Sequence, residues 1–389
     1  MSSPDLNQVR IDISSTDSQL LELLSKRRKL SINVAQSKLA TTKPVRDTER
    51  EQQLLVKLIE QGKALNLDAL YVTQVFHSII EDSVLLQQAY LQNHINPETV
   101  AHKVRVAFLG QQGSYSHLAA QKYFARRAEE VIEHGCASFK EIINTVESGR
   151  ADYALLPIEN TSSGGINEVY DILQHTSLHI VGELSVPVEH CLLVATDTEE
   201  HKIKTIYSHF QPVAQCSEYL STLNDIKIEQ ADSSANALEI VSQLQRDDVA
   251  AIGNSEGGRL YGLTPIQTGI ANQKQNYSRF IVVARKPIDV AAQIPAKTTF
   301  IMSVKQRPGS LVDALLILKQ NKINMCKLES RPIPGNPWEE MFYVDVESNV
   351  DSDNMRNALK NLGEITTFIK ILGCYPSDDI KPTNPTVDS

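Results

Sequence analysis

The first 92 residues carry the apolar pattern of long amphipathic helices. From Asp5 to Thr42, apolar residues recur at helical spacing without an intervening Gly or Pro. A helix of that length would extend roughly 50 Å at ~1.5 Å per residue, which exceeds the width of a domain of about 100 residues. Its apolar stripe can therefore be buried only against a second copy of the chain or a partner. Lys43-Pro44 and Gln61-Gly62 divide residues 1–92 into three predicted helices.

The middle of the chain alternates short apolar segments with helical ones. This alternation over residues 104–285 predicts an α/β architecture with a largely parallel sheet. The predicted strands are Val104–Leu109, Tyr153–Ile158, His179–Val186, Lys204–Ser208, Val249–Gly253 and Phe280–Ala284. Residues 286–297 are expected to form a linker.

The last region, residues 298–376, has a different order of elements. It predicts strand, helix, strand, strand, helix and strand at Thr298–Val304, Leu311–Asn321, Ile323–Ser330, Met341–Glu347, Asp353–Leu362 and Ile365–Leu372. This βαββαβ order is that of a ferredoxin-like α+β fold. The tail after Tyr375 is expected to be disordered.

The composition is that of an ordinary soluble protein of two or three domains, with 41% hydrophobic and 22% charged residues. A formal net charge of −9 argues against nucleic acid as the main partner. The five cysteines are scattered and form no Cys-x-x-Cys pair, so we expect reduced thiols in the cytoplasm and no zinc site. We also expect no signal peptide, no membrane-spanning segment, no metal and no cofactor.

Cations on the first predicted helix suggest an anion site. Arg27 and Lys38 are eleven residues apart and lie on nearly one face, whereas Arg10 lies about 100° round the helix and about five turns before Arg27. Arg10 could therefore reach the equivalent site of a second subunit, which indicates an intertwined dimer. The alternative for the basic run Lys26–Lys29 is a solvated surface, a nucleic-acid patch or a targeting signal.

Polar pairs at helical spacing accompany these cations. Asp47 and Glu51 form one pair at i,i+4, and Ser83 and Gln87 form another on or near a core-facing stripe. For Ser83 and Gln87 the alternative is a satisfied polar pair between helices.

Loops at predicted strand ends collect hydroxyl and amide groups. These are Asn160-Thr161-Ser162-Ser163-Gly164 and Ser208-His209-Phe210-Gln211, which suit a carboxylate ligand in a cleft at the ends of strands. Each could equally be an ordinary capped turn. In Asn276-Tyr277-Ser278-Arg279-Phe280, an arginine and a hydroxyl at the mouth of an apolar strand could anchor a carboxylate and assist loss of hydroxide.

These segments resemble the bacterial bifunctional chorismate mutase/prephenate dehydratase family, often called the P-protein. The stretches Pro44–Asp47 and Ile79–Val84 match it well, and the resemblance continues to about Pro376. It implies an all-helical mutase domain at 1–92, a two-lobed α/β dehydratase domain at 104–285 and an amino-acid-binding ACT domain at 298–376. It also implies chorismate and prephenate as substrates and L-phenylalanine as feedback inhibitor.

The resemblance assigns roles to individual residues. In the mutase, Arg27 and the partner's Arg10 would bind the two carboxylates, Lys38 and Gln87 would face the ether oxygen, Glu51 with Asp47 would take the ring hydroxyl, and Ser83 would assist orientation. In the dehydratase, Ser278 stands where the family's usual Thr-Arg-Phe triplet has threonine, and it would assist loss of the ring hydroxyl. The implied substrate-binding residues are Asn160, Thr161, Ser162, Ser163, Ser208, His209, Gln211, Arg279 and Phe280.

Two segments of the last region resemble the family's phenylalanine site. They are Gly309-Ser310-Leu311-Val312, where the family usually has alanine at the second position, and Glu329-Ser330-Arg331-Pro332. Two other classes of protein are alternatives to a bifunctional enzyme. A transcriptional regulator would need shorter N-terminal helices in a basic domain. A non-catalytic amino-acid sensor is suggested by the last region and by Ser278.

Overall fold

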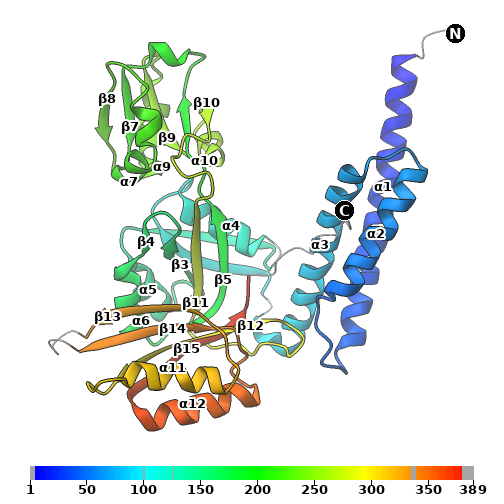
Figure 1. Cartoon of the computed structure of the whole chain (residues 1–389). Coiled ribbons are helices and arrows are strands. Elements are labelled where there is room, and N and C mark those ends of the chain that lie inside the picture. The colour runs from blue at the N-terminus through cyan, green and yellow to red at the C-terminus, as the bar shows by residue number, and fades with distance from the viewer. Residues whose placement is uncertain (1–4, 100, 126, 334–338, 379–389) are drawn as a thin grey trace. The chain divides into compact units, whose positions relative to one another are not determined.

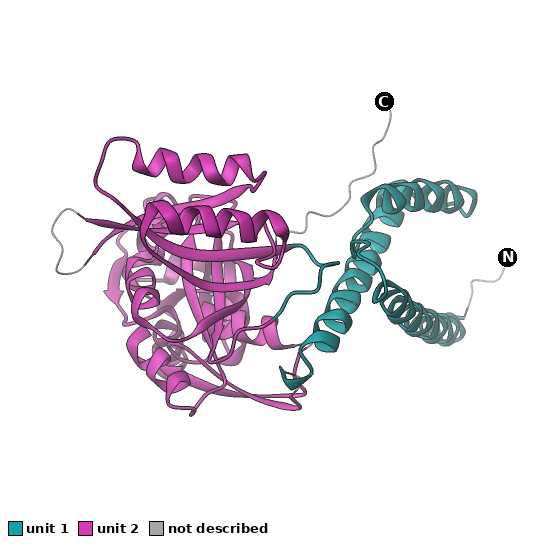
Figure 2. Ribbon diagram, turned by 90° about the horizontal axis from the view of Figure 1, so that it is seen from below, with its two compact units in different colours: residues 1–99, 289–295, 379–389 teal, residues 100–288, 296–378 magenta. Residues whose placement is uncertain are grey.

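The chain forms two compact units. The computed structural model describes residues 5–99, 101–125, 127–333 and 339–378 (Figure 1). Within these, the helical unit comprises residues 5–99 and 289–295, and the sheet unit comprises the described residues of 101–288 and 296–378 (Figure 2). The tail expected to be disordered lies, from residue 379, outside the described residues. In the described part of the chain, no helix is long and apolar enough to cross a membrane.

The helical unit contains the three predicted helices. These are α1 (Leu6–Lys38), α2 (Thr48–Ala64) and α3 (Ala69–Ile95), followed by the short helix η1 (Pro97–Thr99). Each of the three begins at an aspartate whose carboxylate accepts a backbone N–H of the first turn, namely Asp5, Asp47 and Asp68. Helix α2 continues past the predicted break at Gly62, where a Cβ would lie 2.6 Å from Val72 of α3.

Helix α1 leaves its apolar stripe largely exposed. Its 33 residues extend about 50 Å, yet Ser31 and Ala35 are its buried residues. Leu6, Ile11, Ile13, Leu20, Leu21, Leu23 and Leu30 are each more than half exposed. Part of the predicted linker belongs to this unit, since Gln293 donates to the carbonyl oxygens of Lys38 and Thr41, and Asn96 donates to that of Asp289.

The sheet unit contains the two sheets of the middle region. The first has the strand order β2-β1-β3-β11-β5 with β4 beside β3, and the second has the order β10-β6-β9-β7-β8. The strands of the first are β1 (Lys103–Leu109), β2 (Glu130–Cys136), β3 (Tyr153–Asn160), β4 (Gly164–Gly165), β5 (His179–Pro187) and β11 (Tyr277–Ala284). Those of the second are β6 (Cys191–Val194), β7 (Thr205–Ser208), β8 (Lys227–Gln230), β9 (Val249–Gly253) and β10 (Thr264–Thr268).

Helices connect these strands. They are α4 (Tyr115–Phe124), α5 (Phe139–Glu147), α6 (Asn167–His175), η2 (Glu200–Lys202), α7 (Phe210–Gln215), α8 (Ser217–Leu220), α9 (Ser234–Leu244) and α10 (Ser255–Leu260). The prediction of a largely parallel sheet is wrong, because both sheets are mixed. In the first, β11 runs antiparallel to both β3 and β5. The reason is connectivity: the chain leaves the first sheet after β5 and returns to it on β11, so these neighbours run in opposite directions.

The C-terminal region has the predicted βαββαβ order. Its elements are β12 (Ala296–Val304), α11 (Ser310–Gln320), β13 (Met325–Pro332), β14 (Glu340–Val346), α12 (Asp353–Ile365) and β15 (Thr366–Pro376). The strands form an antiparallel sheet in the order β13-β14-β12-β15. Apolar residues on one face of this sheet pack with α11 and α12.

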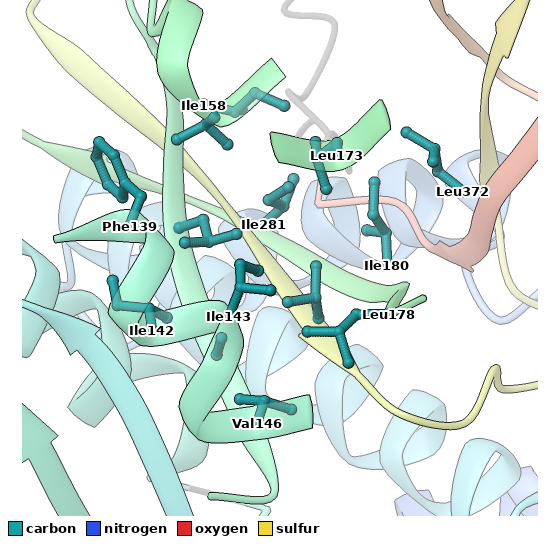
Figure 3. Close-up of a cluster of buried hydrophobic side chains, with 14 of the residues drawn as sticks. Phe139, Ile142, Ile143, Val146, Ile158, Leu173, Leu178, Ile180, Ile281 and Leu372 are labelled. Carbon is teal, nitrogen blue, oxygen red and sulfur yellow. The ribbon is translucent and has the colours of Figure 1, made fainter. Parts of the chain in front are cut away.

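The other face of the C-terminal sheet shares a core with the first sheet. Ile180, Ile281 and Leu173 of the middle region and Leu372 of β15 belong to one buried apolar cluster (Figure 3). Strand β15 approaches β5 so closely that a Cβ on Gly373 would collide with the carbonyl oxygen of Ile180. The C-terminal region is therefore packed into the sheet unit.

Candidate active sites

Four predicted residues form two hydrogen-bonded pairs between α1 and α3 of the helical unit. The Arg27 guanidinium donates to the carbonyl oxygen of Ile79 at 3.0 Å and to the Ser83 hydroxyl. The Lys38 ammonium donates to Gln87 Oε1 at 3.2 Å and to the carbonyl oxygens of Pro44 and Val45 at 2.9 and 2.8 Å. Ser83 and Gln87 are buried. The result is a partly buried cation cluster.

Burial acts on both cations. It lowers the pKa of Arg27, against the opposing effect of Asp82, and it lowers the pKa of Lys38, against that of Asp47. An arginine remains charged in a protein, so the cluster presents a fixed positive charge to any anion that enters it. Because water is partly excluded, that charge acts more strongly than it would in bulk solvent.

The two predicted carboxylates have partners of their own. Asp47 begins α2 and accepts the backbone N–H of Arg50 at 3.1 Å. Glu51 forms an ion pair with Arg46 at 3.1 Å, and the same guanidinium pairs with Glu81 at 2.7 Å. Arg46 was not predicted as a site residue, although its place directly before Asp47 could have drawn attention to it.

Arg10 does not join this cluster in its own chain. It precedes Arg27 by seventeen residues of one continuous helix, which is about 26 Å along the axis. The neighbouring Arg28 instead pairs with Asp82 at 3.1 Å.

A cleft of about 610 Å³ lies in the middle region of the sheet unit. Its walls come from the loop after β3 and from α7, together with the segment before β11. The lining residues are Ser162, Ser163, Gly165, Ile166, Phe210, Gln211, Ala214, Gln215, Asn272 and Gln273. Gln211 donates to the Ser163 hydroxyl at 3.1 Å, so two predicted loops meet there.

Asn160 organises the polar groups behind this cleft. Its Nδ2 donates to Ser278 Oγ at 3.0 Å, to the Tyr277 carbonyl oxygen at 3.0 Å and to Asn276 Oδ1 at 2.7 Å. Its Oδ1 accepts the backbone N–H groups of Ser162 and Ser163 at 2.9 and 3.0 Å. Because Ser278 Oγ accepts from Asn160, its own hydroxyl proton can be given to another group.

Three further predicted residues surround this centre. The Thr161 hydroxyl accepts the backbone N–H of Tyr277 at 2.9 Å and ties the loop to β11. His209 begins α7, its ring lies against Phe210, and burial lowers its pKa. Ser208 is buried and donates to the carbonyl oxygen of His209 at 3.1 Å.

Arg279 and Phe280 do not fit their predicted roles in the cleft. Phe280 is 1% exposed inside a hydrophobic cluster. Arg279 follows Ser278 on β11, and successive side chains of a strand point to opposite faces. Its guanidinium therefore faces the C-terminal sheet, where it pairs with Asp345 at 2.7 Å, Glu183 at 2.8 Å and Glu159 at 3.1 Å.

This ion cluster continues into the C-terminal sheet. Lys297 pairs with Glu183 at 2.9 Å and Lys327 pairs with Glu159 at 2.7 Å, so three cations face three carboxylates. Burial alone would raise the pKa of Glu159, but Lys327 and Arg279 hold it below its usual range. Arg279 is thus an ion-pair partner of both sheets in this structure, and its contacts do not support the predicted role as an anchor of a substrate carboxylate.

The two segments of the predicted phenylalanine site are not brought together within one chain. Gly309, with φ of +85°, Ser310, Leu311 and Val312 form the start of α11. Glu329 lies opposite Tyr343, which packs toward the first sheet, and so faces away from α11. Arg331 forms a bidentate pair with Asp171 of α6 at 2.9 Å, while Ser330 and Pro332 complete β13.

Comparisons with known proteins agree with the division of the chain. Residues 9–88 match the family described as Chorismate mutase type II, and residues 106–288 match the family described as Prephenate dehydratase. The bifunctional chorismate mutase/prephenate dehydratase of Escherichia coli K12 is 54% identical over 378 residues, 97% of this chain and 98% of that protein. The chain belongs to the bifunctional chorismate mutase/prephenate dehydratase family. It is therefore an enzyme of L-phenylalanine biosynthesis that rearranges chorismate to prephenate and converts prephenate to phenylpyruvate. The regulator and sensor alternatives are not favoured.

Solved structures are similar to the sheet unit as well. A prephenate dehydratase from Arthrobacter aurescens, in complex with L-Phe, is 27% identical with a TM-score of 0.64, covering 72% of this chain and 93% of that one. A protein described as GqqA, a novel type of quorum quenching acylase, is 28% identical with a TM-score of 0.63, covering 71% and 98%.

Proposed function

We propose that the mutase reaction takes place at the cation cluster of the helical unit. The rearrangement of chorismate is pericyclic, so the enzyme must hold a folded dicarboxylate and stabilise negative charge on the breaking ether oxygen. Arg27 binds one carboxylate as a two-pronged donor, and Ser83 orients it. Since Lys38 occupies Gln87 Oε1, the Gln87 amide N–H₂ is the group that faces the ether oxygen beside Lys38. The pairing of Arg27 with Ser83 and of Lys38 with Gln87 is the observation that carries this assignment.

A second chain completes this site. Arg10 lies too far from Arg27 to act in the same subunit, and the exposed apolar stripe of α1 suits an intertwined homodimer. In that dimer the partner's Arg10 binds the second carboxylate. Glu51, held by Arg46, and Asp47 receive the ring hydroxyl.

Prephenate is converted in the cleft of the middle region. The Ser278 hydroxyl donates a hydrogen bond to the departing ring hydroxyl, which leaves as hydroxide and takes up a proton from solvent, while carbon dioxide is lost and the ring becomes aromatic. Asn160 supports this role because it occupies a lone pair of Ser278 Oγ and leaves the proton for the substrate. Ser162, Ser163 and Gln211 bind the carboxylates from the walls of the cleft, while Thr161, Ser208 and His209 hold its loops.

The C-terminal region is an ACT domain that binds L-phenylalanine as a feedback inhibitor. The complex of a dehydratase relative with L-Phe supports this assignment. Because Glu329 faces away from the start of α11 in its own chain, the segments 309–312 and 329–332 form a site between subunits. All five cysteines are free thiols, which suits an enzyme of the cytoplasm. The partners of this enzyme are then small molecules and a second copy of the chain, and it binds neither nucleic acid nor a membrane.

Subunit mixing tests the shared mutase site. Arg27→Ala and Arg10→Ala should each abolish mutase activity and leave dehydratase activity intact, because the dehydratase cleft lies in the other unit. When the two inactive proteins exchange subunits, one site of each mixed dimer regains both arginines, so about a quarter of wild-type activity per site should return at full exchange. Absence of recovery despite demonstrated exchange would rule out sharing, and parallel loss of both activities would rule out separate sites.

A further inference from the structure

A chain of hydrogen bonds leads away from the dehydratase cleft to a buried histidine. His190 lies between β5 and β6, is 1% exposed and does not line the cleft. Its Nε2 is 2.8 Å from Gln215 Oε1, and Gln215 lines the cleft at the end of α7. Neither His190 nor Gln215 carries a role in the reaction as described so far.

The contacts of Gln215 determine which way its amide points. Oε1 receives Asn276 Nδ2 at 3.5 Å as well as His190, and both of these side chains are buried. An amide oxygen can accept two hydrogen bonds, whereas the amide nitrogen could accept neither. Because Oε1 of Gln215 is held on the buried side, its Nε2 group faces the cleft. The orientation of the amide thus depends on a donor at His190 Nε2.

Tyr115 fixes the histidine in turn. Its hydroxyl lies 3.2 Å from His190 Nδ1 and donates to the carbonyl oxygen of Glu189 at 2.7 Å, and the two rings are edge-on with centroids 5.8 Å apart. Burial lowers the pKa of His190 and raises that of Tyr115, so both remain neutral near neutral pH. A neutral imidazole carries one proton. The Asn276 contact requires an acceptor at Gln215 Oε1 and so favours the proton on Nε2, and the Tyr115 hydroxyl then shares its proton between His190 Nδ1 and the Glu189 carbonyl oxygen.

We propose that His190 is a positioning residue of the dehydratase, which holds the Gln215 amide so that its N–H₂ group faces a carboxylate of prephenate. The substrate is a dianion, to which an amide N–H₂ is attractive and an amide oxygen is repulsive. Through Asn276, Gln215 is also connected to Asn160 and so to Ser278. This inference rests on the proposed placement of the dehydratase reaction in this cleft.

Two substitutions at His190 separate positioning from simple packing. His190→Met fills a similar volume without a donor, and it should lower dehydratase kcat/KM about 10- to 100-fold, mainly through a higher KM. His190→Gln places an amide N–H₂ near the position of Nε2 and should restore kcat/KM to within about threefold of wild type. Mutase activity should be unchanged in both. His117→Met is the matched control, since His117 is equally buried but contacts Gly113 and Glu133.

A double-mutant cycle tests whether His190 acts through Gln215. Gln215→Met should raise KM about as much as His190→Met, and the double variant should be no worse than either single one. The proposal would be overturned if the losses of kcat/KM in His190→Met and Gln215→Met were additive in the double variant. It would also be overturned if His190→Gln lost as much kcat/KM as His190→Met, or if His117→Met showed the same increase in KM. If Ser278→Ala retained full activity, the placement of the reaction would be wrong instead, and the two failures are thus distinguishable.

Discussion

Asn160→Asp replaces the amide NH₂ by an oxygen and should reverse the polarity of the dehydratase centre. The new carboxylate oxygen replaces Nδ2 and faces Ser278 Oγ, the Tyr277 carbonyl oxygen and Asn276 Oδ1, at distances now between 2.7 and 3.0 Å. The Ser278 hydroxyl then donates its hydrogen bond to the new carboxylate and can no longer donate it to the substrate. Removal of one hydrogen-bond donor to a transition state costs ~2.7–4 kcal/mol, so kcat should fall about 10²–10³-fold. The Tyr277 carbonyl oxygen loses the Asn160 donor but keeps the backbone N–H of Thr161 at 2.9 Å.

Steady-state kinetics of phenylpyruvate formation measures this effect, and mutase activity in the same chain reports on the integrity of the protein. Asn272→Asp adds the same charge at the exposed rim of the cleft and controls for repulsion of the dianionic substrate. Below the pKa of the new carboxyl group, which is about 3.9 without perturbation and higher when buried, the group can donate again and activity should recover. A wild-type kcat in Asn160→Asp, or an equal loss of kcat in Asn272→Asp, would refute the reasoning.

Two more predictions concern single side chains. Ser278→Ala should remove most dehydratase activity because the hydroxyl is required. Ser278→Thr should keep or raise the activity because its β-methyl group restricts the rotamers of the hydroxyl. A fully active alanine variant would place the proton donor elsewhere. Gln87→Glu should make the mutase weakly active at neutral pH, and its activity should recover as the pH falls. The reason is that a protonated glutamate, whose unperturbed pKa is about 4.3, regains a donor to the ether oxygen. A flat pH profile with wild-type activity would exclude Gln87 as that donor.

The helices and the C-terminal order of elements were predictable because their patterns are local. Strands β2, β4, β6, β8 and β10 are not predicted, and strands of two to four residues such as β4 and β6 offer too few positions for a periodic pattern. Strand direction was also misjudged, because the pairing of β11 with β5 depends on where the chain returns after the second sheet. That return is a tertiary property without a local signal.

Within the dehydratase site, the alternation of β11 adds information that the motif alone lacks. Ser278 and Arg279 are neighbours on this strand, so their side chains face opposite ways. The rule therefore predicts that only one of the two reaches the cleft. Gln215 and His190 could not have been found in this way, since one ends a six-residue helix and the other lies in a connection.

The buried charges of the first sheet also matter before the C-terminal sheet exists. Glu159, Glu183 and Arg279 all precede β12 in the chain, and synthesis of the residues after Arg285 takes about 5–20 s at ~5–20 residues per second. During that interval the face bearing Ile180 and Ile281 has no cover. Charged side chains on an open sheet face oppose pairing with another chain. We therefore expect these three charged residues, which later become part of an internal ion cluster, to disfavour aggregation of the chain while that face is open.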